Sequence, residues 1–234
     1  MEKKEIELLR ENCEIARGMK DEEIDKLDAY LKETPCLRRP DFLQVANLIE
    51  LEDLRKSCYP AMPEPFAHPY GENLFWLFCC ESLFVEGHYG PCCIWARAVV
   101  EFELQEFCLL DAIVPEGFKT QIRNPGKHRT PGLDECLEKL KLGNSLRPED
   151  HKACAAVKDN GDYVVHHRLD RIMGQIPEDI FRQRGVPESE VNSLGLEDRR
   201  VLMKILRYDR ERIRAKESMK NLYEFESRRP PIPL

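Results

Sequence analysis

Apolar residues recur at intervals of three and four along most of the chain, the spacing that places them on one face of an α-helix. Residues 6–16 and 24–31 have this spacing and predict a helical hairpin broken near residues 19–21. Pro40 and Asp41 then open a third helix, since both residue types favour a first helical turn. Alternation with a period of two, the pattern of a half-buried strand, nowhere exceeds a few residues. The pattern therefore predicts an all-α protein.

Five further helices are predicted after residue 72. Glycine and proline mark most of their ends, because glycine terminates helices and proline begins them. The helices are expected at about residues 73–86 (ending at Gly87), from Gly90 to about 108, 133–143, 148–174 and 197–226. The polar segment 115–130, rich in Pro, Gly, Lys and Arg, is expected to be a loop.

These elements indicate a main helical domain with additions at both ends. Residues 59–71 contain four prolines and are expected to form an extended connection. The predicted organisation is an N-terminal helical extension (1–58), the connection (59–71), the main bundle (72–176), a charged C-terminal helix (177–227) and an extended tail (228–234).

Composition and charge narrow the class of protein. The 234 residues are 42% hydrophobic, which is enough for a packed core, and the net charge of -7 excludes general affinity for polyanions. Residues 197–229 nevertheless hold eleven Lys or Arg against seven Asp or Glu, a local +4 that leaves -11 elsewhere. Any polyanion is therefore expected at the C-terminal helix first.

The apolar segments are too short to span a bilayer, which takes ~18–20 consecutive apolar residues. The first residues are charged and amphipathic, unlike a secretory signal. We therefore expect a cytoplasmic protein with no membrane partner.

The chain has ten cysteines, none of them in a C-x-x-C pair. Zinc-ribbon and thioredoxin spacings are therefore missing. Most of the cysteines lie in apolar helical segments, where a free thiol behaves as a small hydrophobic group. Reduced core cysteines are expected, with disulfides as the alternative if the source is a hyperthermophile.

Candidate chemistry is concentrated in residues 157–167, which include Lys158, an Asp-Asn-Gly-Asp run (159–162) and the pair His166-His167. Glycine within a helix costs roughly 1 kcal/mol relative to alanine, and aspartate and asparagine are also unfavourable there. A local role for these residues is therefore expected.

Four motifs follow one another in the order of a known superfamily. They are Glu-Gly-His-Tyr-Gly (86–90), Trp-Ala-Arg-Ala-Val-Val-Glu (95–101), a Leu-rich helix ending at Gly143, and the Lys158…His166 segment. Over residues 72–174 this order resembles the HEPN superfamily, specifically a branch of prokaryotic domains of unknown function. The resemblance implies an up-and-down helical bundle, often dimeric, in which the basic-to-His motif faces a cleft.

Active members of that superfamily use an R-x4-6-H motif for metal-independent RNA cleavage. By resemblance, His166 moves the 2′-OH proton, Lys158 stabilises charge on the phosphate and Asp159 orders the site. The expected cleft-lining residues are Arg97, Glu101, Asn160, Asp162 and His167. The sequence departs from the motif, because lysine replaces arginine and seven residues separate it from the histidine. Eight helical positions turn by about 800°, so the two groups converge only if Gly161 distorts the helix.

Simpler interpretations accompany each candidate. Residues 159–162 are also compatible with a helix break followed by a new helix at His166. Arg97 and Glu101 could form an ordinary i,i+4 ion pair. Arg123 and His128 satisfy R-x4-H literally, but Pro125 and Gly126 indicate a surface loop, with phosphate contact as the alternative.

No metal site is predicted. His151 with Cys154, or His166 with His167, supplies too few convergent ligands, and adjacent helical residues point to different faces.

The leading hypothesis is a non-catalytic HEPN-like module for protein interaction or ligand sensing, without a cofactor, that forms a homodimer through helix faces. One alternative is a metal-independent endoribonuclease that uses His166 with Lys158. The other is nucleotide or nucleic-acid binding, RNA included, through the basic C-terminal helix.

Overall fold

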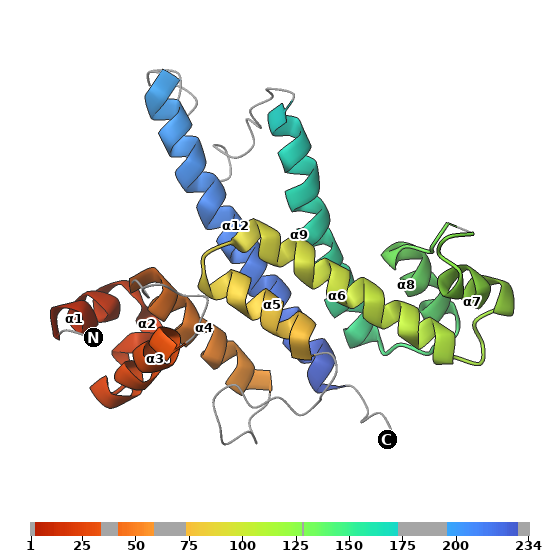
Figure 1. Ribbon diagram of the computed structural model, residues 1–234, viewed down its shortest axis with the longest axis horizontal. Coiled ribbons are helices and arrows are strands. Elements are labelled where there is room, and N and C mark those ends of the chain that lie inside the picture. Colours follow the sequence, from red (N-terminus) through yellow and green to blue (C-terminus); the bar gives the residue numbers. More distant parts are fainter. Residues whose placement is uncertain (1–2, 34–41, 59–73, 128, 173–195, 229–234) are drawn as a thin grey trace.

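A computed structural model describes residues 3–33, 42–58, 74–127, 129–172 and 196–228 (Figure 1). Within these ranges the regular structure is entirely helical. The helices are α1 (Lys3–Asn12), α2 (Glu14–Arg17), α3 (Asp21–Glu33), α4 (Phe42–Cys58), α5 (Leu74–Val85), α6 (Tyr89–Leu110), α7 (Glu116–Arg123), α8 (Leu133–Leu142), α9 (Pro148–Ile172) and α12 (Leu196–Ser227). The predicted all-α helical bundle is confirmed.

Helix α6 lies at the centre of the bundle. It packs against α5, α8, α9 and α12, and α9 packs along α12. In Figure 1, α5 and α6 cross in front of α9 and α12, which diverge from each other beyond the crossing. Buried side chains from α1 through α12 form one hydrophobic core, so the long helices share a single packed interior.

The tight turn between α5 and α6 depends on Gly87, whose φ of 76° is favourable only for glycine. The His88 N–H donates to the Leu83 carbonyl (2.8 Å) and the Gly87 N–H to the Phe84 carbonyl (3.0 Å). These bonds satisfy the last carbonyls of α5. The helix stop that the sequence predicts at Gly87 is therefore confirmed.

Helix α4 is fastened to this turn by Asn47. The Asn47 amide donates to the carbonyls of Phe84 and Val85 (both 3.2 Å) and accepts from the Tyr89 hydroxyl (2.8 Å). Because Asn47 is fully buried, each bond replaces one that water would otherwise supply. Helix α4 is thereby held in one register on the α5–α6 pair.

A second buried contact joins α5 to α12. The Tyr223 hydroxyl donates to Glu81 at 2.6 Å, and both residues lie in the core. Burial, with the neighbouring Glu81 carboxylate, raises the pKa of Tyr223 well above its ordinary value. The hydroxyl therefore remains a donor across the physiological pH range.

The structure corrects two expectations. The segment 115–130 contains helix α7, because Phe118 and Ile122 are spaced one turn apart and pack on the core. The proposed helix break at 159–162 is also wrong, since α9 continues through Gly161 to Ile172.

Several expectations fall outside the described residues. They are the connection at 59–71, the end near residue 174 of the helix predicted at 148–174, the segment 177–195 and the tail beyond Arg228. Among the helices that the structure does describe, none has the length and apolar content needed to cross a membrane.

Candidate functional site

The structure brings three of the predicted cleft residues together in a row of alternating charges. The Asp162 carboxylate contacts Lys158 Nζ through Oδ2 (3.0 Å) and Arg97 Nε through Oδ1 (2.9 Å). Arg97 Nη1 reaches Glu101 Oε2 at 3.3 Å, and Lys158 Nζ reaches Asp134 Oδ1 at 3.3 Å. We call these five residues, which come from α6, α8 and α9, the charge ladder.

Lys158 is a partner for carboxylates in this arrangement. Besides Asp134 and Asp162, Asp159 lies 3.7 Å from Nζ. The hydrogen bond to Asp162 raises the pKa of Lys158 and outweighs partial burial, which lowers it, and the bond to Asp134 adds to the increase. The ammonium group is therefore charged, but its charge is matched by acidic neighbours.

Gly161 is explained by the packing of α9 on α6. A Cβ atom at this position would lie 2.7 Å from both Cβ and Cδ of Arg97, closer than real side chains approach. Glycine therefore lets the Arg97 side chain lie flat across α9, where it reaches Asp162. The cost of a helical glycine is offset by close approach of the two helices.

Asn160 faces a different helix from the charge ladder. Its Oδ1 accepts from Arg214 Nη1 (2.7 Å), and its Nδ2 donates to the Arg214 carbonyl (3.4 Å) and to Glu217 Oε2 (3.3 Å). Asn160 thus fixes α12 on α9. Asn160 therefore faces α12, whereas Arg97, Glu101 and Asp162 pair with one another. The HEPN resemblance implies one cleft for all four.

His166 is exposed and lies eight positions after Lys158 on an uninterrupted helix. Eight residues rise about 12 Å and turn the direction of the side chain by about 80°. The helix shows no distortion at Gly161 that would bring the two groups together. The side chain of His167 lies outside the described residues.

The literal R-x4-H segment is also divided. Arg123 ends α7 and forms an ion pair with Glu116, whereas residues 125–127 form a turn. His128 is not among the described residues. Among the described residues, no group of three His, Cys, Asp or Glu side chains is placed to hold a metal ion.

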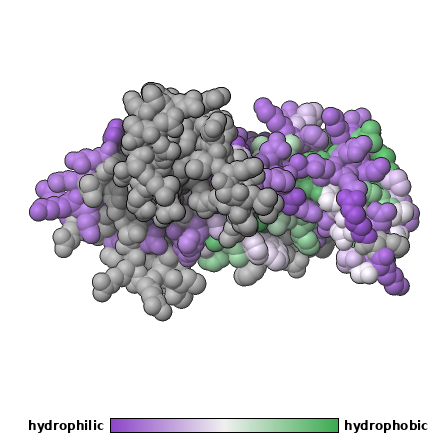
Figure 2. Space-filling view, turned by 90° about the horizontal axis from the view of Figure 1, so that it is seen from above, coloured by the Kyte–Doolittle hydropathy of each residue, from purple (hydrophilic) through white to green (hydrophobic). Residues whose placement is uncertain are grey.

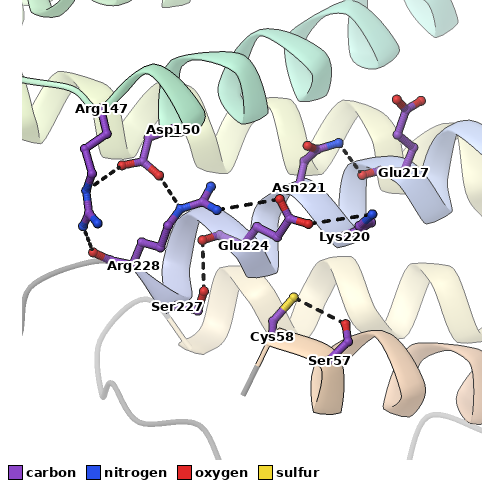
Figure 3. A network of polar contacts seen from close by, with 10 residues as sticks. All are labelled: Ser57, Cys58, Arg147, Asp150, Glu217, Lys220, Asn221, Glu224, Ser227 and Arg228. Atoms are coloured by element: carbon purple, nitrogen blue, oxygen red, sulfur yellow. Dashed lines mark hydrogen bonds and ion pairs between the residues drawn. The ribbon is translucent and has the colours of Figure 1, made fainter. Parts of the chain in front are cut away.

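Three described basic residues, Arg212 and Lys216 of α12 and Arg228 just after it, hold this helix in place. Arg212 and Lys216 both contact Glu50 of α4, at 2.8 and 2.7 Å. Figure 3 shows the end of the helix, where Arg228 contacts Asp150 (2.6 Å) and the Arg228 carbonyl accepts from Arg147. Their positive charges are therefore paired within the molecule.

The sequence also leaves one surface feature unpredicted, on a partly exposed side of α6. Trp95, Ala98 and Phe102 follow Pro91 at intervals of four, three and four residues, which places all four on one side of the helix. Trp76 of α5 packs on Trp95 with a ring separation of 5.3 Å. We call these five residues the outer face.

The outer face exposes large aromatic groups. Trp76 and Phe102 retain 40% and 46% of their accessible surface, although most large apolar side chains in the described chain are buried. Figure 2 shows hydrophobic surface along the middle of its lower edge, the side where α5 and α6 lie toward the viewer in Figure 1. The spacing of Pro91, Trp95, Ala98 and Phe102 is visible in the sequence. However, α6 is apolar on two sides, and the spacing alone does not indicate which side the rest of the protein covers.

Comparison with known proteins finds no relative, so any functional assignment depends on the fold and on the outer face. No family model, curated protein or solved structure matches the chain. What is established is a class of architecture, an all-α bundle with an exposed aromatic surface on α5 and α6.

Proposed function

We propose that the protein is a non-catalytic helical interaction module that associates through the outer face, with a second copy of the chain as partner. The exposed aromatic side chains of the outer face carry this proposal. Contiguous exposed apolar surface is uncommon on monomeric proteins, and aromatic residues dominate the binding energy of protein interfaces.

The order of residues along α6 favours self-association. Ala98 is small and lies between Trp95, three residues before it, and Phe102, four residues after it. Two antiparallel copies of α6 that cross at Ala98 would place Trp95 of one copy beside Phe102 of the partner subunit. A twofold interface needs such self-complementarity, since each patch contacts an identical one.

Replacing Phe102 with glutamate is expected to weaken self-association by at least about tenfold, because two charges enter a desolvated interface related by symmetry. Sedimentation velocity over a range of protein concentrations measures this. Leu142→Glu is the matched control, since Leu142 is 73% exposed and lies outside the outer face. A wild-type protein that stays monomeric at about 100 μM, a weak affinity for a specific complex, would contradict the proposal.

The ribonuclease hypothesis has less geometric support. Lys158 is matched by carboxylates, and His166 lies about two helical turns further along α9. We therefore expect wild-type protein and His166→Ala to leave labelled RNA equally intact over hours without metal. Cleavage by the wild type that is lost in His166→Ala would restore the catalytic assignment.

Nucleic-acid binding through Arg212, Lys216 and Arg228 is likewise less favoured, because these three residues already contact carboxylates of other helices. The HEPN resemblance is compatible with the bundle and with a dimer. It adds no residue to the outer face.

A further inference from the structure

Two arginines of α12 differ from Arg212 and Lys216 of the same helix, which both contact Glu50. Arg210 and Arg214 are one helical turn apart, and both guanidinium groups lie over the ring of Tyr163 on α9. The distances from the guanidinium carbon to the ring centroid are 4.6 Å for Arg210 and 3.7 Å for Arg214. The tyrosine ring therefore holds two cationic groups side by side by cation–π attraction.

Their charges lack the carboxylate partners that their neighbours have. Among the described residues, Arg214 donates to the neutral amide oxygen of Asn160, and no ion pair involves Arg210. Nη1 of Arg210 and Nε of Arg214 are buried without a hydrogen-bond acceptor in that part of the chain. Buried donors of this kind are uncommon in native proteins, but Arg212 Nε and Arg228 Nη2 share this property. What distinguishes Arg210 and Arg214 is that both stack on one tyrosine ring without a carboxylate partner among the described residues.

Two nearby carboxylates contact other groups. Glu217 accepts from the Asn160 amide, and Glu211 lies against Gly90 of α6. His166 follows Tyr163 by three positions on α9, so it lies on an adjacent part of the helix surface and is exposed. The surface beside Tyr163 therefore has two arginines and one histidine as donors.

We propose that Arg210, Arg214 and Tyr163 form the floor of a phosphate-binding site between α9 and α12, with His166 at its edge. Guanidinium groups bind phosphate through two parallel hydrogen bonds, and arginines that are already partly desolvated lose less hydration when an anion binds. The ligand is a phosphate group, carried either by the free anion or by a nucleotide. The site contains no residue of the outer face, so it does not rest on the proposed function.

Isothermal titration of the full chain with orthophosphate and with adenosine monophosphate, in low salt, tests this site. We expect saturable binding with a Kd of about 1 mM or tighter, and at least a tenfold loss in Arg210→Gln. Tighter binding of the nucleotide identifies it as the ligand, whereas equal affinities identify the free anion.

Arg123→Gln is the matched control, because Arg123 is an exposed arginine of α7 that pairs with Glu116. Its affinity for both ligands should equal that of the wild type. Circular dichroism verifies that Arg210→Gln is folded, and Arg210→Lys should retain part of the binding because it keeps the charge without the bidentate geometry. Failure of the wild type to bind either ligand, or unchanged binding by Arg210→Gln, would overturn the proposal.

Discussion

Between pH 8 and pH 10 we expect the free energy of unfolding to fall by about 5 kcal/mol, because four buried thiols ionise only after the protein unfolds. Burial raises the pKa of Cys80, Cys92 and Cys154 above the ordinary value of 9.0, and that of Cys93 to about 12. The six buried cysteines of the described chain are all free thiols.

The sign follows from the direction of these shifts. A thiol whose pKa is raised on folding contributes its full stabilisation below pH 9 and loses it as the pH rises toward the folded-state pKa. Each thiol accounts for about 1.4 kcal/mol between pH 8 and pH 10. The loss summed over the four thiols is comparable with the total free energy of unfolding of an ordinary domain. The protein should therefore approach unfolding near pH 10.

Urea unfolding followed by circular dichroism, in the presence of a reductant, measures this pH dependence. Cys92→Ala is the control: it should be less stable at pH 7, because it shortens a buried side chain, but should lose about a quarter less stability between pH 8 and pH 10. A stability that is flat across this range would show that the thiols are not buried as described.

Substitution of Gly161 by valine is expected to lower the free energy of unfolding by about 3 kcal/mol, near the upper end for overpacking. The reason is the contact of α9 with α6, where even a Cβ atom would lie 2.7 Å from Arg97 Cβ. Gly161→Ala should also destabilise, although alanine is normally the better helix former by roughly 1 kcal/mol. Urea denaturation measures both variants.

Gly117 provides the matched control for this prediction. It lies in α7, and a Cβ atom there would meet nothing within 4 Å. Gly117→Ala should therefore be neutral or stabilising by up to about 1 kcal/mol. If Gly161→Ala were as stable as wild type, the close approach of α6 and α9 would be contradicted.

Much of the fold can be predicted from the sequence, because the helices are long and glycine or proline marks most of their ends. Gly87 and Pro148 mark helix ends that the structure confirms to within a residue or two. Helix α7 is the exception, since it is only eight residues long and its polar surroundings conceal the apolar pair Phe118 and Ile122.

The candidate site is harder to predict from the sequence, because its contacts join residues that are distant in sequence. The ion pair of Arg97 with Glu101 follows from i,i+4 spacing, and the structure contains it. The pairing of Lys158 with Asp134 depends on how α8 packs beside α9, and the bonds of Asn160 depend on α12. Local patterns contain no information about either.

The outer face illustrates a different limit. Both sides of α6 are apolar, and the sequence gives no indication of which side the rest of the chain covers. Only the packed structure distinguishes buried Val100 from exposed Phe102. Self-association through this face, the ribonuclease alternative and the HEPN relationship all remain predictions.

Hydroxyl-radical footprinting of the wild-type protein at low and high concentration tests the central proposal most directly. If copies associate through the outer face, oxidation of Trp76 and Phe102 should slow at high concentration. Leu110 and Leu142, which are exposed elsewhere at 82% and 73%, should be oxidised at the same rate under both conditions. Unchanged oxidation of Trp76 and Phe102, or protection of Leu110 and Leu142 instead, would contradict the assignment of this face as the interaction surface.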